Sequence, residues 1–112
     1  MTLQDLRSKH ERCFSAIFDD FGFEILPGWA NLVDATLTRL SSTHPAVRVT
    51  RIKEKFGTLR IGVELPVPYN VRPILHEATR ASETICETCG KEGILLNDGN
   101  GLQVRCSAHE DV

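Results

Sequence analysis

Cys86-Glu-Thr-Cys89-Gly90 and Cys106-Ser-Ala-His109 are two short pairs of metal-binding residues, and sixteen residues separate them along the chain. A structural zinc site takes four Cys or His ligands, commonly supplied as two such pairs. Gly90 directly follows the second cysteine, as in a zinc knuckle, where glycine tolerates the positive φ of a tight turn around the metal. The spacing therefore predicts a zinc site with the ligands Cys86, Cys89, Cys106 and His109.

The alternatives are a redox pair formed by Cys86 and Cys89, or two unrelated pairs. A redox Cys-X-X-Cys motif is expected at a strand-to-helix junction in a βαβ pattern, and no such pattern is visible here. Either alternative also leaves Cys106 and His109 unexplained. Because four protein ligands close the coordination sphere, no position remains for substrate or water, and we expect Zn²⁺ to be a structural cofactor.

The length and composition indicate an ordinary soluble domain. The chain has 112 residues, of which 41% are hydrophobic and 25% are charged. We expect a single domain over 1–112, with an α+β core at 1–82 and a zinc-binding lobe at 83–112. The sequence has neither the roughly eighteen consecutive apolar residues of a membrane helix nor the apolar core of a signal peptide. With three cysteines assigned to a metal and Cys13 alone, a reducing, cytoplasmic location is expected.

The net charge of −2 is unevenly distributed along the chain. Residues 47–65 carry five basic and two acidic side chains, whereas residues 83–112 carry two basic and six acidic ones. The zinc-binding segment therefore has the wrong sign for contacts with phosphate groups. Any nucleic-acid-binding surface would have to lie on the basic segment.

The N-terminal segment predicts one amphipathic helix over 3–21, because apolar residues recur at three- and four-residue spacing. Thr2 suits its N-cap and Gly22 its end. Cys13 lies on the apolar stripe and is expected to be a buried structural thiol. His10 lies on the same stripe and is interpreted as a boundary or satisfied core residue, since the sequence supplies no partner for it.

Two further helices follow from the same periodicity. The second begins at 27 or 28, where Pro suits a first helical turn, and it ends in the turn-forming run 41–45. Trp29 is interpreted as a core anchor between the first two helices, with an exposed binding aromatic as the alternative. The third helix begins at 71 or 73 and ends at Glu83, with Asn70 as a candidate cap.

The segment 47–65 predicts an antiparallel β-hairpin. The residues of its second strand that alternate onto one buried face are Leu59, Ile61, Val63 and Leu65. The first strand, 47–53, stays in phase only with a bulge near Thr50–Arg51, and the turn falls at 55–57. Lys53, Lys55 and Arg60 then lie near one end of the hairpin, either as a solvated face or as a surface that binds a negatively charged partner.

The C-terminal segment predicts a second hairpin, in which the apolar runs 94–96 and 102–104 flank a Gly- and Asn-rich loop. Three residues follow His109, so a zinc ribbon or a truncated treble clef fits better than a full treble clef. The expected fold class is α+β: two N-terminal helices, an antiparallel β-hairpin, a third helix and this C-terminal zinc-binding hairpin.

Four motifs in this order resemble a family of small, uncharacterised bacterial and phage proteins. The motifs are Pro27-Gly-Trp29, Ile52-Lys-Glu-Lys-Phe-Gly-Thr-Leu-Arg60, Ser82-Glu-Thr-Ile-Cys-Glu-Thr-Cys-Gly90 and Arg105-Cys-Ser-Ala-His109. The family combines a Gly-Trp helix start, a Lys-Glu-Lys-Phe-Gly strand turn and a C-terminal zinc-knuckle pair. The resemblance implies zinc ligands at the four positions already named, and it carries over no established activity.

Three kinds of function remain to be weighed. The expected function is a zinc-stabilised cytoplasmic module that binds another protein as a regulator or inhibitor, and a phage-encoded inhibitor of a bacterial defence or housekeeping system would fit. The alternative is a nucleic-acid-binding zinc protein that uses the basic hairpin at 48–60. An enzyme is not expected, because His10, His44 and His76 are scattered and no Ser-His-Asp, paired-carboxylate or phosphate-loop motif is visible.

Overall fold

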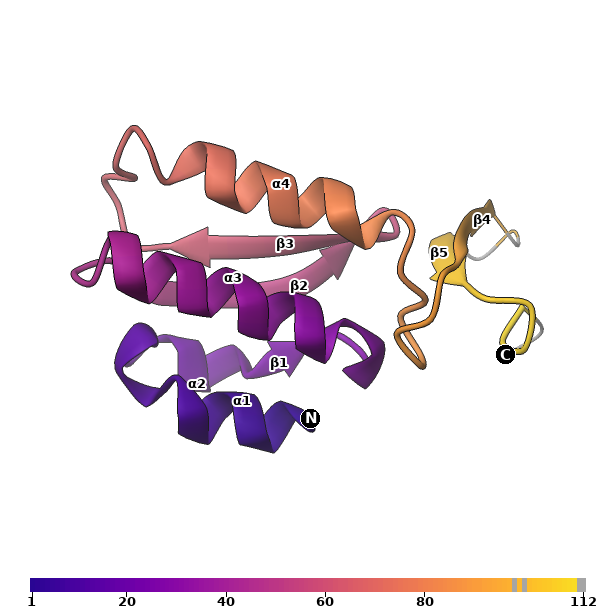
Figure 1. Cartoon of the computed structure of the whole chain (residues 1–112), viewed down its shortest axis with the longest axis horizontal. Coiled ribbons are helices and arrows are strands. Elements are labelled where there is room, and N and C mark those ends of the chain that lie inside the picture. Colours follow the sequence, from indigo (N-terminus) through magenta and orange to yellow (C-terminus); the bar gives the residue numbers. More distant parts are fainter. Residues whose placement is uncertain (98, 100, 111–112) are drawn as a thin grey trace.

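The computed structural model describes residues 1–97, 99 and 101–110, which form a mixed α+β fold with two small sheets (Figure 1). The α-helices of the described residues are α1 (Leu3–Lys9), α2 (Phe18–Phe21), α3 (Ala30–Thr43) and α4 (Arg72–Ser82). Two short 3₁₀ helices are η1 (Glu11–Cys13) and η2 (Pro27–Trp29). The strands are β1 (Phe23–Glu24), β2 (Val49–Lys55), β3 (Thr58–Val63), β4 (Ile94–Asn97) and β5 (Leu102–Arg105).

The prediction of one helix over 3–21 is wrong, because the segment breaks after Lys9 and folds back. The predicted start is confirmed: Thr2 and Asp5 form a reciprocal capping box, and Gly22 ends α2 with a φ of 64°. Between α1 and α2 the chain becomes extended, and the N–H of Ser15 donates to the carbonyl oxygen of Val49 at 2.9 Å.

The break is explained by an aromatic cluster that a straight helix could not form. Phe14, Phe18 and Phe23 pack with ring centroids 4.4 to 6.1 Å apart. Such pairs contribute about 0.5–1.5 kcal/mol each beyond the area that they bury. The apolar residues of this segment thus have the spacing of a helix, but tertiary packing outweighed the local helix propensity.

The remaining helices lie close to the predicted ranges. The chain enters α3 through η2, with Pro27 in the first turn as expected. Asn70 does not cap α4: Val71 takes that position without a side-chain bond, and the Asn70 Oδ1 atom instead lies 2.8 Å from His44 Nε2. Among the described ranges, no helix has both the length and the apolar character that crossing a membrane requires.

The first sheet has the strand order β1-β2-β3. The predicted antiparallel hairpin is confirmed, and so is the bulge, since the register shifts between Val49 and Arg51. The two residues after Gly22 form β1, which pairs parallel to β2 and which the sequence did not predict. The placement of Leu65 on the buried face is wrong: β3 ends at Val63 and Leu65 is 85% exposed, because the prolines that follow cannot continue the ladder.

The core lies between the first sheet and the helices. In Figure 1, α3 crosses in front of the sheet and α4 runs along β3, while the β4–β5 hairpin projects beyond the end where β2 turns into β3. That turn touches the projecting lobe. A Cβ atom added to Gly57 would lie 2.6 Å from Leu95 Cδ1 and 3.2 Å from Leu102 Cβ. The position of the lobe is thus fixed by direct packing on the hairpin turn.

Candidate metal centre

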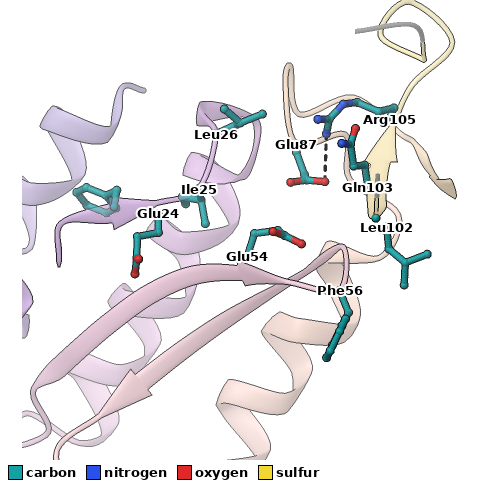
Figure 2. A pocket seen from close by; sticks show the side chains of 11 residues that line it. Glu24, Ile25, Leu26, Glu54, Phe56, Glu87, Leu102, Gln103 and Arg105 are labelled. Carbon is teal, nitrogen blue, oxygen red and sulfur yellow. Dashed lines mark ion pairs between the residues drawn. The ribbon is translucent and has the colours of Figure 1, made fainter. Parts of the chain in front are cut away.

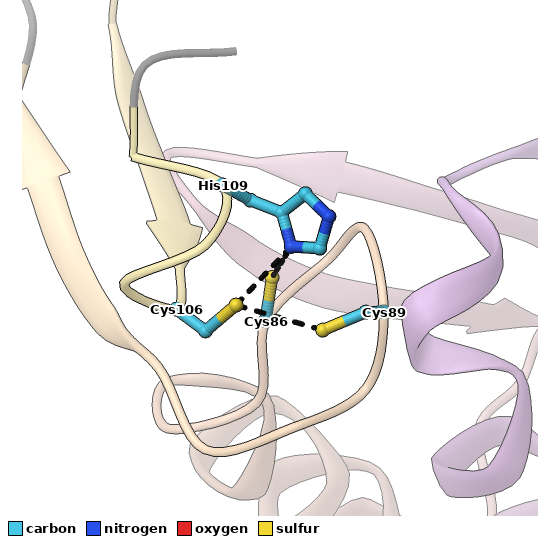
Figure 3. A group of neighbouring side chains, drawn as sticks. All are labelled: Cys86, Cys89, Cys106 and His109. Atoms are coloured by element: carbon cyan, nitrogen blue, oxygen red, sulfur yellow. Dashed lines mark hydrogen bonds between the residues drawn. The ribbon is translucent and has the colours of Figure 1, made fainter.

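Four potential ligands converge between the two halves of the lobe (Figure 3). Their ligand atoms all lie within 4.8 Å of one another, and the residues are Cys86, Cys89, Cys106 and His109. Cys89 Sγ lies 3.6 Å from Cys106 Sγ, and His109 Nδ1 lies 3.1 Å from Cys106 Sγ and 3.8 Å from Cys86 Sγ. All four cysteines of the chain are free thiols. The cluster can therefore hold a metal ion, as the sequence spacing predicted.

Backbone hydrogen bonds build the first half of the cluster as a tight turn. The N–H of Cys86 donates to the carbonyl oxygen of Lys91 at 2.7 Å, and the N–H of Gly90 donates to that of Cys86 at 2.9 Å. Gly90 has a φ of 85°, a conformation that glycine adopts without a steric penalty. The turn directs both cysteine side chains to the same side, as the knuckle interpretation requires.

The second half follows β5. Cys106 directly continues the strand, and the N–H of His109 donates to the carbonyl oxygen of Cys106 at 3.0 Å. This turn brings the imidazole over the sulfur atoms, with Nδ1 directed at them (Figure 3). The pairing of β5 with β4 carries the second pair of ligands back to the first.

The environment of the cysteines favours one thiolate at neutral pH. Burial opposes ionisation of Cys86, but backbone N–H groups of Cys89, Cys106 and Thr88 lower its pKa to about 6. For Cys89, the backbone N–H of Lys91 lowers the pKa, and burial together with the Cys106 and Cys86 sulfurs outweighs it, so the pKa is raised. A cation among these sulfurs would remove their mutual repulsion and stabilise the thiolates.

The residues at the start of α3 hold the knuckle, a role that the sequence did not predict. The N–H of Gly28 donates to the carbonyl oxygen of Glu87 at 2.7 Å, and Trp29 Nε1 donates to that of Ile85 at 2.9 Å. Trp29 is fully buried, so the core-anchor interpretation is confirmed, while its polar edge contacts the lobe. The available signal was that a Gly-Trp motif and a Cys-X-X-Cys motif occur in the same chain, although they lie far apart in the sequence.

Glu87 and Arg105 form a second connection that sequence reasoning missed. The Glu87 carboxylate accepts from the N–H of Val104 at 2.8 Å and lies 3.1 Å from Arg105 Nη1 (Figure 2). Both side chains are buried. Burial raises the pKa of Glu87, although the Val104 N–H and the Arg105 charge act against this shift. The pair ties the knuckle to β5, the strand that precedes Cys106.

A cleft of about 520 Å³ lies between β1 with the two residues that follow it, the β2–β3 turn and the lobe (Figure 2). Its carboxylates already have partners. Glu24 accepts two hydrogen bonds from Arg51, and Glu54 accepts one from the N–H of Gly57 at 2.7 Å. We therefore interpret this cleft as part of the contact between core and lobe.

The three predicted partner-binding residues lie on one face of the hairpin. Lys53 and Arg60 are directly opposite each other in the β2–β3 register, and Lys55 pairs with Thr58 in the same alternation. Lys55 and Arg60 are exposed and Lys53 is half-buried. The buried apolar residues of both strands point to the other face, toward the helices.

The remaining histidines and Cys13 lie apart from the cluster. His10 is buried and its Nε2 lies 2.7 Å from Asp34 Oδ1, a partner that sequence reasoning did not identify. Cys13 is buried as predicted, and burial raises its pKa against the weaker effects of Arg48 and Ser41. His44 bonds Asn70, and His76 is exposed on α4.

Comparison with known proteins yields no relative from which a role could be transferred. No family model matches the chain, and neither the curated proteins nor the solved structures contain a significant match. The assignment of function therefore rests on the geometry of the cluster and the charges of the hairpin.

Proposed function

We propose that this chain is a zinc-stabilised cytoplasmic module that binds another protein and acts as its regulator or inhibitor, without catalytic activity. The observation that carries the proposal is the placement of Lys53, Lys55 and Arg60 on the hairpin face that points away from the helices. The resemblance to small bacterial and phage proteins noted above is compatible with an inhibitor of a bacterial system.

The metal proposed for the cluster is zinc. In a tetrahedral site with metal–sulfur bonds of about 2.3 Å, the sulfur–sulfur edges are about 3.8 Å and the sulfur–nitrogen edges about 3.5 Å. The separation of 3.6 Å between Cys89 and Cys106 and those of 3.1 and 3.8 Å to His109 lie around these values. Three thiolates and one imidazole are a ligand set that zinc prefers, and they fill its coordination sphere.

The position of the cluster supports a structural role for this zinc. It lies between the knuckle, which Gly28 and Trp29 attach to the core, and the end of β5, which Glu87 attaches to the knuckle. Binding free energy at such a site contributes directly to the free energy of folding. Zinc would thus hold the lobe against the turn of the basic hairpin.

Lys53 has one charged neighbour of each sign across the strands, Glu24 on β1 and Arg60 on β3. Like charges directly opposite each other on neighbouring strands destabilise a sheet, and Lys53 and Arg60 are such a pair. The neighbouring Arg51 is neutralised by Glu24 at 2.7 Å, so it does not add to the excess. A charge excess that is unfavourable for the isolated fold is explained if an acidic partner surface compensates it on binding.

Capture of partners by the zinc-loaded, tagged chain from nuclease-treated lysate tests the proposal. We expect the charge-reversed variant Lys53→Glu/Lys55→Glu/Arg60→Glu to lose a protein that the parent chain captures. A matched variant reverses three exposed cations elsewhere, Arg12→Glu/Arg80→Glu/Lys91→Glu, and should retain it. Zinc content is measured for each variant. Equal capture by the parent and the hairpin variant would show that the three cations contact only solvent and do not bind a partner.

Nucleic-acid binding is the second candidate, because the same three cations could contact phosphates. The acidic lobe beside the hairpin opposes it. Titration of mixed DNA and RNA at two salt concentrations separates the candidates. Tight binding that falls steeply with salt would favour nucleic acid, since each phosphate contact adds about one unit to the slope of log affinity against log salt.

A further inference from the structure

Strand β3 is at the edge of the first sheet, and only part of that edge is covered. In the antiparallel register, the N–H and C=O groups of Arg60 and Gly62 point to β2, so those of Leu59, Ile61 and Val63 point outward. The hydrogen bond from Glu64 N–H to Arg48 O, at 2.9 Å, continues the same alternation.

Side chains of helix α4 form hydrogen bonds with the outward backbone groups of Leu59, but not with those further along the edge. Ser82 Oγ accepts from the N–H of Leu59 at 2.9 Å, and Thr79 Oγ1 donates to its carbonyl oxygen at 2.7 Å. Within the described part of the chain, no hydrogen bond reaches the outward groups of Ile61 or Val63. An open edge of this kind is a template for pairing with another strand.

A groove of about 820 Å³ runs beside this free edge, between β3, α4 and the loop that joins them. Apolar side chains, among them Ile61, Val67 and Leu75, line much of it. Its charged and titratable lining residues are Arg60, Tyr69, Arg72 and His76, and none of the lining residues is a carboxylate. The groove therefore combines free backbone groups, an apolar floor and a rim of one charge sign.

We propose that an extended acidic segment of a partner protein adds to the edge of β3 at Ile61 and Val63. Its backbone would complete the ladder, alternate apolar side chains would lie in the groove, and carboxylates between them would face Arg60 and Arg72. Strand addition uses main-chain hydrogen bonds for affinity and alternate side chains for specificity. The inference rests on the proposed protein-binding function and names the chemistry of the partner.

The edge itself argues for an extended occupant over a helical one. A helix satisfies its own backbone groups and would leave those of Ile61 and Val63 without partners. The rim argues for acidic side chains, since a basic segment would be placed beside Arg60 and Arg72 without compensation. The same cation, Arg60, belongs to the hairpin face and to the groove, so one partner can contact both.

The test uses the full zinc-loaded chain and short synthetic peptides of alternating Val and Glu. One peptide is unmodified, a second is N-methylated at alternate backbone positions, and a third has Lys in place of Glu. Amide hydrogen exchange is followed by NMR. With the unmodified peptide we expect the Ile61 and Val63 amides to exchange about tenfold more slowly, equivalent to about 1.4 kcal/mol. The other two peptides should produce no protection.

A variant in the groove separates this inference from the proposed function. Arg72→Glu should weaken binding of the acidic peptide about fivefold, the loss of one exposed charge contact, whereas Arg80→Glu on the same helix should not. Absence of acidic-peptide binding, or binding without protection of Ile61, overturns strand addition. Strand addition by an acidic segment is also overturned if the N-methylated peptide or the Lys peptide binds as tightly as the unmodified one. If Arg72→Glu leaves partner capture intact while the hairpin variant abolishes it, the protein-binding function stands and the edge site falls.

Discussion

The indole N–H of Trp29 donates a hydrogen bond of 2.9 Å to the carbonyl oxygen of Ile85, the residue that precedes the first cysteine of the cluster. The ring of Trp29 is buried in the core, so one side chain joins the core and the metal-binding lobe. Gly28 adds a backbone bond to Glu87 within the same knuckle. Metal binding and core packing are therefore expected to depend on each other.

Gly28→Ala should be severely destabilising, because a Cβ atom there would lie 2.2 Å from the Cys86 carbonyl oxygen and 2.3 Å from that of Glu87. Backbone atoms cannot rotate away, so the helix start and the knuckle must separate. We expect a loss of about 3 kcal/mol or more in the free energy of unfolding, at the upper end for single substitutions. Denaturant unfolding of the zinc-loaded protein measures it.

Gly22→Ala is the control for this substitution, since its φ of 64° disfavours Ala while no atom lies within 4 Å of the added Cβ. It should lower the free energy of unfolding by about 1–3 kcal/mol through backbone strain alone. A Gly28→Ala variant no less stable than Gly22→Ala would contradict the close contact between η2 and the knuckle.

Trp29→Phe removes the hydrogen bond to Ile85 and keeps most of the buried ring. The carbonyl oxygen loses its donor, and we expect a decrease of about 1–3 kcal/mol in the free energy of unfolding. Zinc transfer to a chromogenic chelator should also become faster, because the knuckle is released from the core. Leu37→Ala, a cavity in α3 away from the knuckle, should reduce stability without a comparable acceleration. If zinc transfer becomes faster by the same factor in both variants, the effect of Trp29→Phe is due to general loss of stability and not to the bond with the knuckle.

Metal analysis should find one zinc ion per chain after purification without added zinc. Chelation, or Cys89→Ser, is expected to lower the melting temperature strongly, because a metal held by the cluster would join the knuckle to the end of β5. Cys13→Ser is the matched control: this thiol is buried but lies outside the cluster, so zinc content should stay the same. An unchanged melting curve after demonstrated metal removal would exclude a structural role.

The ligand cluster and the β-hairpin could be predicted from the sequence because their signals are local. Paired Cys and His spacings determine which residues can meet at a metal, and strict alternation determines which face of β3 is buried. The bulge between Val49 and Arg51 was predictable for the same reason, since the apolar residues before and after it are out of phase. Each of these features is indicated by spacings within one short stretch, or within two short stretches that sixteen residues separate.

The features that the sequence did not predict depend on contacts between distant segments. The helix break after Lys9 follows from the packing of Phe14 and Phe18 on Phe23, and the short β1 is stabilised by pairing with a strand almost thirty residues later. The pairing of Glu87 with Arg105 requires the lobe to be folded. Periodicity carries no information about such pairings, because it reports only which face of an element is apolar.

The pair of buried His10 and half-buried Asp34 predicts a measurable dependence of stability on pH. Hydrogen bonds from His10, and then from Lys9, lower the pKa of Asp34. A carboxyl group whose pKa is lowered by folding contributes stability above its unfolded pKa of about 3.9, and this contribution is lost as the pH falls through the folded pKa.

Asp34→Asn should therefore lower the free energy of unfolding by about 1–3 kcal/mol at neutral pH, the value of a hydrogen bond to a charged group. The difference between parent and variant should disappear below the folded pKa of Asp34, as measured by urea unfolding across the acidic range. Loss of metal in acid affects both proteins and cancels in the difference. Asp20→Asn, on the exposed side of α2, serves as the control. A difference that stays constant with pH would contradict the lowered pKa of Asp34.

The final prediction separates stability from binding at the cross-strand pair of Lys53 and Arg60. Arg60→Glu replaces a like-charge pair with an opposite-charge pair in direct register, so the free energy of unfolding should rise by a few tenths of a kcal/mol. The same change should weaken capture of an acidic partner, mainly through slower association, and the loss should shrink as salt screens the charges.

Lys55→Glu is the matched variant: its cross-strand neighbour is the uncharged Thr58, so it should affect binding and leave stability nearly constant. Unfolding curves at low and high salt, together with association rates for the captured partner, provide both quantities. A less stable Arg60→Glu variant would mean that the two cations do not repel each other across the strands, and the argument for a partner-facing surface would lose its physical basis.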